Sequence, residues 1–278
     1  MVLDIQNVSK KYSKEQYGLK NFSIQIEKGI LGLLGANGAG KSTLLKMIAT
    51  VNKPTSGIIT LNKNNIAKDA NYMRKYLGFL PQDFGVYPNL NAYEFLEYMA
   101  AMKGIGGNNL KQKIAQLLEG LNLIENAKKP IGTYSGGMKQ RVGIAQTLLN
   151  NPKIILFDEP TVGLDPEERV RFRNLISDLA NDCIVILSSH IVSDIDSIAD
   201  KVAILKKGSL VSYGNQQEII DKVRDKVFEI DIENHHLNDF KKDHLVVSSS
   251  KKEGKLKVRY ISNPVSYTHL TLPTIYSV

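Results

Sequence analysis

The fold of this chain is decided by the stretch Gly35-Ala36-Asn37-Gly38-Ala39-Gly40-Lys41-Ser42-Thr43. The stretch matches the pattern G-x-x-x-x-G-K-[ST], and it lies between an apolar run at residues 30–34 and residues at helical spacing. A loop between a strand and a helix is the context required of a phosphate-binding loop. Its glycines allow backbone N–H groups to surround a polyphosphate, and the following helix adds its positive amino end. We expect Lys41 to reach the β- and γ-phosphates and the Ser42 hydroxyl to bind Mg²⁺.

Two adjacent acids end a second apolar run. Residues 154–157 are Ile, Ile, Leu and Phe, and Asp158 and Glu159 follow directly. Ligands bind at the carboxyl ends of the strands of parallel sheets. We therefore expect Asp158 to serve Mg²⁺ through water, and Glu159 to orient or deprotonate an attacking water. The alternative, a pair of solvated acids at a strand end, is disfavoured by the phosphate loop in the same chain.

A second turn of anion-binding type precedes another helical stretch. Ser135, Gly136 and Gly137 come directly before residues 138–149, which have a helical pattern. A Ser/Gly helix start offers backbone donors to an anion. As a bare tripeptide the signal is weak, because the same residues also serve as an ordinary helix cap.

The periodicity around these motifs predicts an α/β fold. Continuous apolar runs at 30–34, 154–157 and 183–187 are typical of strands buried on both faces, and the strand-helix-strand order predicts a parallel sheet. Alternating residues near the amino terminus predict a small antiparallel sheet. Residues 91–150 change to a helical period and predict a helical subdomain.

Beyond residue 221 the pattern turns strand-like again. Alternating apolar residues predict a small β-rich accessory segment at 221–263. The final stretch, 264–278, contains no Asp, Glu, Lys or Arg and resembles translated vector sequence, so we exclude it from fold reasoning as a suspected non-native tail. A short native β tail is the alternative.

Composition excludes several classes of protein. With 278 residues the chain is long enough for a sizeable core, and no apolar run approaches the ~20 residues needed to cross a bilayer. Its single cysteine, Cys183, cannot form an internal disulfide. The formal charge of +8 favours an acidic partner, which a nucleotide, a nucleic acid or an anionic membrane face would each satisfy.

Taken in order, the motifs resemble those of the nucleotide-binding subunit of an ATP-binding cassette (ABC) transporter of the bacterial exporter type, and the match spans about 2–220. The stretch 35–43 resembles the Walker A loop, and 154–159 resembles the Walker B strand with its catalytic glutamate. Residues 134–138 resemble the signature sequence of the family, with Tyr134 for the usual leucine and Met138 for the usual glutamine.

Single residues extend the resemblance. Gln82 resembles the glutamine-loop residue, the stretch 163–165 resembles the loop that crosses the dimer interface, and His190 is similar to the switch histidine. Tyr12 lies about where the family places the aromatic ring that stacks on adenine, and Tyr17 is the competing position.

The resemblance therefore implies three sets of site residues. Catalysis is assigned to Glu159, His190 and Gln82. ATP binding is assigned to Tyr12, Gly35, Asn37, Gly38, Gly40, Lys41, Ser42, Thr43, Ser135, Gly136, Gly137 and Asp165. Mg²⁺ binding is assigned to Ser42, Gln82 and Asp158.

The same resemblance implies the fold class and the domains. We expect an α/β P-loop NTPase with a parallel sheet, an amino-terminal antiparallel β subdomain and an inserted helical subdomain. The ATPase domain would span 1–220, with the helical subdomain at about 90–150, followed by the segments 221–263 and 264–278.

The family mechanism would follow from two subunits packed head to tail. Each ATP would lie between the Walker A loop of one chain and the signature of the other, so that ATP binding closes the dimer and hydrolysis reopens it. The chain would be the ATPase of a membrane exporter, at the cytoplasmic face of the membrane. It would pair with a second copy or a paralogous cassette and with separate transmembrane permease subunits.

Two other functions compete with this interpretation. A soluble mechanical ATPase that acts on ribosomes or nucleic acid suits the basic charge. Such chains usually carry two cassettes or a long coiled-coil insertion, and this sequence shows neither, which disfavours that function. A sensor that does not hydrolyse ATP is disfavoured by Glu159.

An aromatic cluster follows the glutamine loop. It consists of Phe84, Tyr87, Phe95 and Tyr98, in the region that receives a short helix of the membrane subunit in the family. We expect these rings either to line that groove or to lie in the core.

Overall fold

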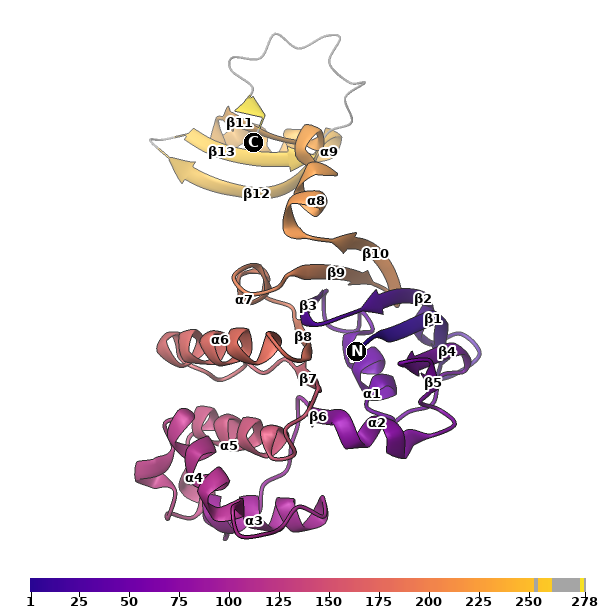
Figure 1. Cartoon of the computed structure of the whole chain (residues 1–278). Coiled ribbons are helices and arrows are strands. Elements are labelled where there is room, and N and C mark those ends of the chain that lie inside the picture. The colour runs from indigo at the N-terminus through magenta and orange to yellow at the C-terminus, as the bar shows by residue number, and fades with distance from the viewer. Residues whose placement is uncertain (253–254, 262–275, 278) are drawn as a thin grey trace. The chain divides into compact units, whose positions relative to one another are not determined.

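A parallel sheet forms the centre of the first part of the chain. The computed structural model describes residues 1–252, 255–261 and 276–277 (Figure 1). Its largest sheet has the order β10-β9-β3-β8-β7-β6. The strands are β3 (Gly29–Leu34), β6 (Leu77–Leu80), β7 (Ile154–Asp158), β8 (Ile184–Ser189), β9 (Lys201–Lys206) and β10 (Ser209–Gly214). Strands β3 and β6 to β9 pair in parallel, and every residue of β7 and β8 is buried, as their continuous apolar sequence predicts.

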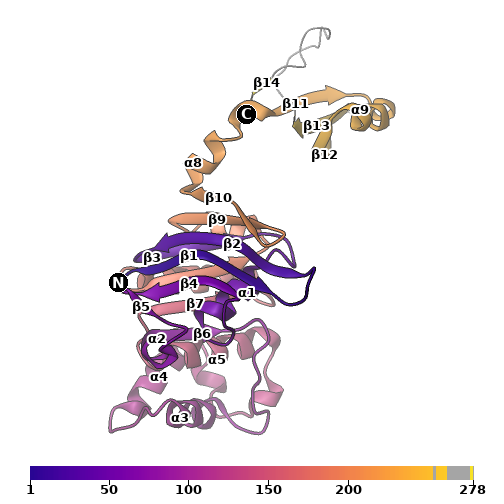
Figure 2. The same ribbon diagram turned by 90° about the vertical axis from the view of Figure 1, so that its right-hand side faces the viewer.

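A smaller antiparallel sheet lies on the same core. It has the order β2-β1-β4-β5, from β1 (Leu3–Lys11), β2 (Tyr17–Ile26), β4 (Ser56–Leu61) and β5 (Asn64–Asn65) (Figure 2). Alternate residues of β2 are buried, so one face of this sheet is apolar. Helix α1 (Lys41–Ile48) begins at the phosphate loop, and its Leu44, Leu45 and Ile48 pack in one core with both sheets. The predicted α/β fold is confirmed.

Helices occupy the inserted region and the connections between strands. They are α2 (Ala70–Tyr76), α3 (Ala92–Met102), α4 (Leu110–Gly120), α5 (Gly136–Leu148), α6 (Pro166–Ala180) and α7 (Val192–Asp196), with short 3-10 turns at Ile124–Asn126 and Ile131–Thr133. Helix α3 begins with a capping box, in which the Asn91 side chain accepts from the Glu94 N–H and the Glu94 side chain accepts from the Asn91 N–H. Helix α4 buries Ile114 and Leu118, which lie one turn apart on one face of the helix.

The chain divides into two units, Met1–Tyr213 and Gly214–Val278. The second unit contains α8 (Gln216–Asp221), β11 (Val227–Ile232), α9 (Leu237–Asp243), β12 (Leu245–Lys252), β13 (Lys255–Ile261) and β14 (Tyr276–Ser277), with 3-10 turns at Arg224–Lys226 and Asn234–His236. Its sheet has the order β12-β13-β11-β14. The suspected non-native tail at 264–278 lies outside the described residues, except for β14.

Candidate active site

The phosphate loop borders a hollow of about 420 Å³ that collects residues from distant parts of the sequence. The hollow is lined by Tyr12, Gln16, Tyr17, Gly18, Asn37, Gly38, Ala39, Gly40, Lys41, Ser42, Thr43, Gln82 and Glu159. The loop follows the carboxyl end of β3, Gln82 follows β6, and Glu159 follows β7. Because parallel strands end at one edge of the sheet, these segments meet there.

Gly40 shows why this loop needs glycine. Its φ of +109° lies in the left-handed region, and a Cβ at this position would lie 2.5 Å from the carbonyl oxygen of Gly18. A larger residue would therefore be strained and would collide with the neighbouring backbone. Gly40 directly precedes α1, so the loop presents the amino end of that helix to the hollow.

Lys41 is buried beside the loop that it belongs to. Its Nζ donates to the carbonyl oxygens of Gly35 at 2.7 Å and Ala36 at 3.3 Å. The same ammonium lies 3.3 Å from Glu159 Oε1, and the two side chains are only 4% and 8% exposed. The lysine expected to bind phosphate and the glutamate expected to act as base are thus an ion pair.

The acids at the end of β7 are held by β8. Asp158 is paired in register with Ser188, whose Oγ donates to Asp158 Oδ1 at 2.7 Å. The same Oγ accepts from the backbone N–H of Glu159 at 3.0 Å. Glu159 has a φ of +52°, which turns the chain sharply after the strand. Its Oε2 lies 3.0 Å from His190 Nδ1, so the histidine that follows β8 contacts the same carboxylate.

Ser188 is a site residue that the sequence analysis did not assign. Ser188 directly follows the apolar run at 183–187, but its two hydrogen bonds depend on the pairing of β7 with β8. Its hydroxyl links the two acids, and removing it would leave a buried carboxylate and a buried N–H without this partner.

Two tyrosines line the hollow. Tyr12 Oη lies 3.2 Å from Thr43 Oγ1, and its ring is half exposed. The ammonium groups of Lys11 and Lys20 lie 5.1 and 5.2 Å from the centre of the Tyr17 ring. A base that stacked on Tyr17 would compete with these cations for the ring. Near Tyr12, the ammonium of Lys10 lies 5.7 Å from the centre of the ring, and the hydroxyl of Tyr12 contacts Thr43 at the end of the phosphate loop.

The second predicted anion-binding turn does not reach this hollow. Ser135 caps α5, since its Oγ accepts from the backbone N–H of Met138 at 3.2 Å. Asp165 caps α6, since its Oδ1 accepts from the backbone N–H of Glu168 at 2.8 Å. Ser135, Gly136, Gly137 and Asp165 are absent from the lining of the hollow, so this chain gathers one part of the predicted site and presents the other elsewhere.

Tyr134 differs from the leucine usual in the related signature, and the structure shows how it fits. The ring is buried, and its hydroxyl donates to the carbonyl oxygen of Asn126 at 2.7 Å. Burial raises the pKa of the Tyr134 phenol. The tyrosine therefore packs as an apolar residue with a satisfied polar end.

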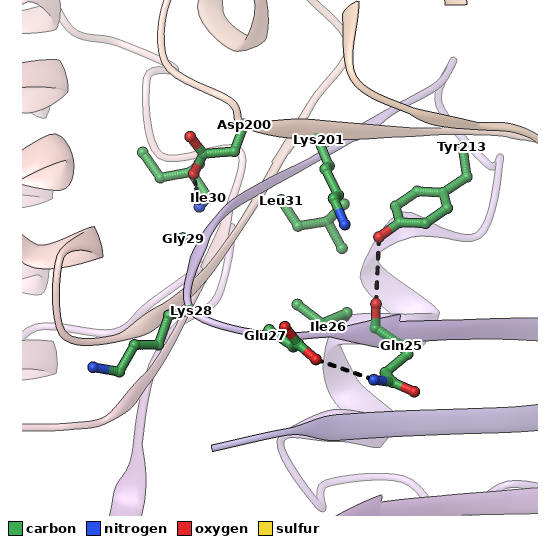
Figure 3. Close-up of a pocket in the computed structure, with 10 residues that line it drawn as sticks. All are labelled: Gln25, Ile26, Glu27, Lys28, Gly29, Ile30, Leu31, Asp200, Lys201 and Tyr213. Atoms are coloured by element: carbon green, nitrogen blue, oxygen red, sulfur yellow. Dashed lines mark hydrogen bonds between the residues drawn. The ribbon is translucent and has the colours of Figure 1, made fainter. Parts of the chain in front are cut away.

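A further hollow, of about 360 Å³, lies at the opposite ends of the strands, where β3 and β9 begin (Figure 3). Several of its polar groups bond to other residues of the lining: Asp200 accepts from the Ile30 N–H at 2.7 Å, and Tyr213 donates to the Gln25 carbonyl at 3.3 Å. The Gln25 amide donates to Glu27 at 3.2 Å. We do not assign this hollow to the active site.

Comparison with known proteins gives a consistent result. The family model described as ABC transporter matches residues 19–162. An uncharacterized ABC transporter ATP-binding protein of Bacillus subtilis, YxlF, is 36% identical over 83% of this chain and 77% of its own. The linearmycin resistance ATP-binding protein LnrL of Bacillus subtilis is 34% identical over 80% of this chain and 72% of its own length. The dimeric bacterial ABC transporter cassette MJ0796 superposes with a TM-score of 0.71 at 29% identity, over 77% of this chain and 98% of that one. Among the described residues, no helix is long and apolar enough to cross a membrane.

Proposed function

Because the chain belongs to the ABC transporter family as an ATP-binding subunit, we propose that it hydrolyses ATP between two chains packed head to tail. The partner would be a second copy or a paralogous cassette. One observation carries this proposal: the phosphate loop and Glu159 share a hollow, whereas the Ser135–Gly137 turn lies outside it. A partner chain that supplied its own turn would complete each site.

The residues of the hollow have separate proposed roles. Lys41 would leave Glu159 and bind the β- and γ-phosphates, and the backbone of Asn37, Gly38 and Gly40 would donate to phosphate oxygens. Thr43 would add a hydroxyl on the same helix start. Tyr12 would pack against adenine.

The donor set fits Mg²⁺. Ser42 and Gln82 line the hollow, and the carboxylate of Asp158 lies at the end of the adjacent strand. A hydroxyl, an amide and one carboxylate are oxygen donors, and Mg²⁺ is commonly held by one or two carboxylates together with substrate phosphates. The bound ion would neutralise phosphate charge, and Ser42, Gln82 and Asp158 would position it.

Glu159 would act as the general base towards water. A positioned base contributes roughly 10²- to 10⁴-fold to the rate. His190 contacts Oε2 of this carboxylate and would orient it, while Gln82 would help to position the attacking water. Gly35 would serve differently from the other loop glycines, since its carbonyl oxygen holds the ammonium of Lys41.

ATP would favour the closed pair because its γ-phosphate gains donors from both chains. The partner's Ser135–Gly137 turn and the loop at Asp165 would contribute only on closure. Hydrolysis would remove the bridging phosphate and reopen the pair. This cycle of closure and opening is the mechanical output that we propose for the chain.

We assign the output to export through separate transmembrane permease subunits, at the cytoplasmic face of the membrane. The name of the relative LnrL denotes resistance, a role that an exporter performs.

Tyr87 and Tyr98 are exposed and contact each other edge to face, with ring centres 5.2 Å apart, whereas Phe95 is buried. We propose that the two tyrosines contact the permease and that Phe95 belongs to the core.

The test is the substitution Glu159→Gln in the full chain. We expect ATP turnover to fall at least 10²-fold and a dimer to accumulate at saturating ATP in analytical ultracentrifugation. Glu167→Gln is the matched control, because Glu167 is exposed and pairs with Arg171 on the surface of α6. Unchanged turnover would exclude Glu159 as the base, and a strictly monomeric variant would exclude the closed pair.

The assignment to export has its own test. The wild-type chain is purified from detergent-solubilised cells, and the proteins bound to it are identified. A polytopic membrane protein that is lost on Tyr87→Ala supports the proposed partner. Bound RNA that dissociates at high salt would instead favour the soluble mechanical ATPase.

A further inference from the structure

An ion pair outside the hollow joins the two elements that we expect to meet the partner's nucleotide. Arg141 Nη2 lies 2.7 Å from Glu168 Oε1, and the side chains are 14% and 16% exposed. Arg141 lies one helical turn after Gly137 on α5, and Glu168 lies in the first turn of α6, directly after the loop at Asp165. The pair therefore connects the start of α5 to the start of α6.

Arg141 is fixed from a second side. Its Nη1 donates to the carbonyl oxygens of Leu121 and Asn122, at 3.0 Å each, where the chain leaves α4. The planar guanidinium thus binds a carboxylate and two carbonyl groups at once, which an ammonium cannot do with the same geometry. Loss of the carboxylate would leave a largely buried cation without its counter-charge.

Glu168 also sets the spacing of the two loops. Its Oε2 lies where a side chain on Gly137 would be, since a Cβ added to Gly137 would be 2.5 Å from that oxygen and 3.3 Å from the carbonyl oxygen of Gly163. One carboxylate oxygen therefore binds Arg141, while the other abuts the backbone of the Ser135–Gly137 turn. The backbone of the same residue donates to the Asp165 cap.

We infer that Arg141 and Glu168 are positioning residues, which hold the Ser135–Gly137 turn and the 163–165 loop as one rigid surface for the nucleotide of the partner chain. The inference rests on the proposed head-to-tail pair. Neither residue lines the hollow around the phosphate loop. The ion pair therefore serves the half of the site that this chain lends to its partner, and nucleotide binding to the chain's own loop does not depend on it.

The test compares Glu168→Gln with Glu167→Gln, which makes the same change one residue earlier on an exposed position of α6. Binding of a fluorescent ADP analogue to the monomer should stay within about twofold of wild type for both variants. Turnover should fall by roughly 10- to 100-fold for Glu168→Gln alone, because displacement by about 1 Å costs this much in a preorganised site. In the Glu159→Gln background, the ATP concentration that gives half dimer should rise by a similar factor.

A double-substitution cycle separates positioning from a general loss of structure. Arg141→Met and Arg141→Met/Glu168→Gln should show nearly the same turnover, within about twofold, because either change breaks the same pair. Arg141→Lys keeps the charge but loses the planar fork, so it should lose turnover and dimerisation nearly as strongly as Arg141→Met if the pair sets geometry. Full recovery by lysine would show that charge alone suffices and would overturn the positioning role. If Glu168→Gln does not fold, this lysine variant carries the comparison.

The outcomes distinguish this inference from the proposed function. If the Glu159→Gln parent stays monomeric at saturating ATP, the proposed pair fails and the inference falls with it. If the parent dimerises and Glu168→Gln dimerises and turns over like Glu167→Gln, the pair stands and the positioning role is overturned. Additive losses in the double-substitution cycle would overturn it as well.

Discussion

The contact between Lys41 and Glu159 predicts that the catalytic carboxylate weakens nucleotide binding to the single chain. The ammonium lies 3.3 Å from Oε1 in a buried position. At this distance, and at an effective dielectric constant of about 20, two unit charges attract by about 5 kcal/mol, much of which desolvation offsets. A hydrogen bond to a charged group retains a net value of about 1.5–3 kcal/mol. When a nucleotide phosphate binds the ammonium of Lys41, it has to replace the contact of that ammonium with Glu159.

Glu159→Gln should therefore bind ADP about 10- to 100-fold more tightly than wild type, since about 1.4 kcal/mol corresponds to a factor of ten. ADP is the appropriate ligand because it lacks the γ-phosphate that is proposed to close the dimer. Affinity is measured by titration with a fluorescent ADP analogue, at a protein concentration where the chain is monomeric. Glu167→Gln is again the control and should match wild type.

A second double-substitution cycle, of Glu159→Gln with Lys41→Met, tests why Glu159→Gln binds ADP more tightly. The gain comes either from loss of the ion pair or from loss of repulsion between Glu159 and phosphate. If the ion pair is responsible, Glu159→Gln should give no gain in the Lys41→Met background, where no pair exists. Repulsion alone would give the same gain in both backgrounds. Equal gains, or an ADP affinity that Glu159→Gln leaves unchanged, would refute the reasoning.

Three further predictions follow from single contacts. Ser188→Ala should lower the free energy of unfolding in urea by about 1–3 kcal/mol, because Asp158 and the next backbone N–H lose a buried partner; a stability equal to wild type would contradict this. Tyr12→Ala should weaken binding of ATP about tenfold but leave binding of inorganic triphosphate unchanged, because the ring is expected to contact the base and not the phosphates; equal losses for both ligands would exclude that role. The hydrogen bond from Arg259 holds the pKa of the Glu229 carboxyl below its usual range. The folded state is therefore stabilised at neutral pH and loses this contribution as pH falls through the lowered pKa, so Glu229→Gln should be less stable than wild type at neutral pH and equally stable in acid.

The parallel strands and the phosphate loop could be predicted from the sequence because each depends on local pattern. A continuous apolar run such as 154–157 is buried on both faces wherever it lies in the sheet. The loop at 35–43 is specified by its own glycines, and Gly40 has the positive φ that its place before α1 requires. Local rules of this kind need no knowledge of the rest of the chain.

The partners of the site residues could not be predicted in the same way. The sequence assigns Lys41 to phosphate, but in the structure its ammonium lies 3.3 Å from Glu159, which follows a strand that is distant in sequence. The aromatic cluster also divides in a manner that residue type does not indicate. Phe95 faces the core, whereas Tyr98, less than one turn later on α3, is exposed beside Tyr87.

Register explains why these contacts are hidden in the sequence and why small changes there should matter. Asp158 meets Ser188 because β7 and β8 pair with those residues opposite each other, and a shift by one position would replace the hydroxyl with a residue on the other face. The same pairing places His190 beside the second oxygen of Glu159. Both oxygens of this carboxylate thus have partners, His190 after β8 and Lys41 at the end of the phosphate loop. A nucleotide phosphate competes with Glu159 for Lys41 and not for His190. The contact between His190 and Glu159 can therefore persist while the other carboxylate oxygen of Glu159 becomes free to accept a proton from water.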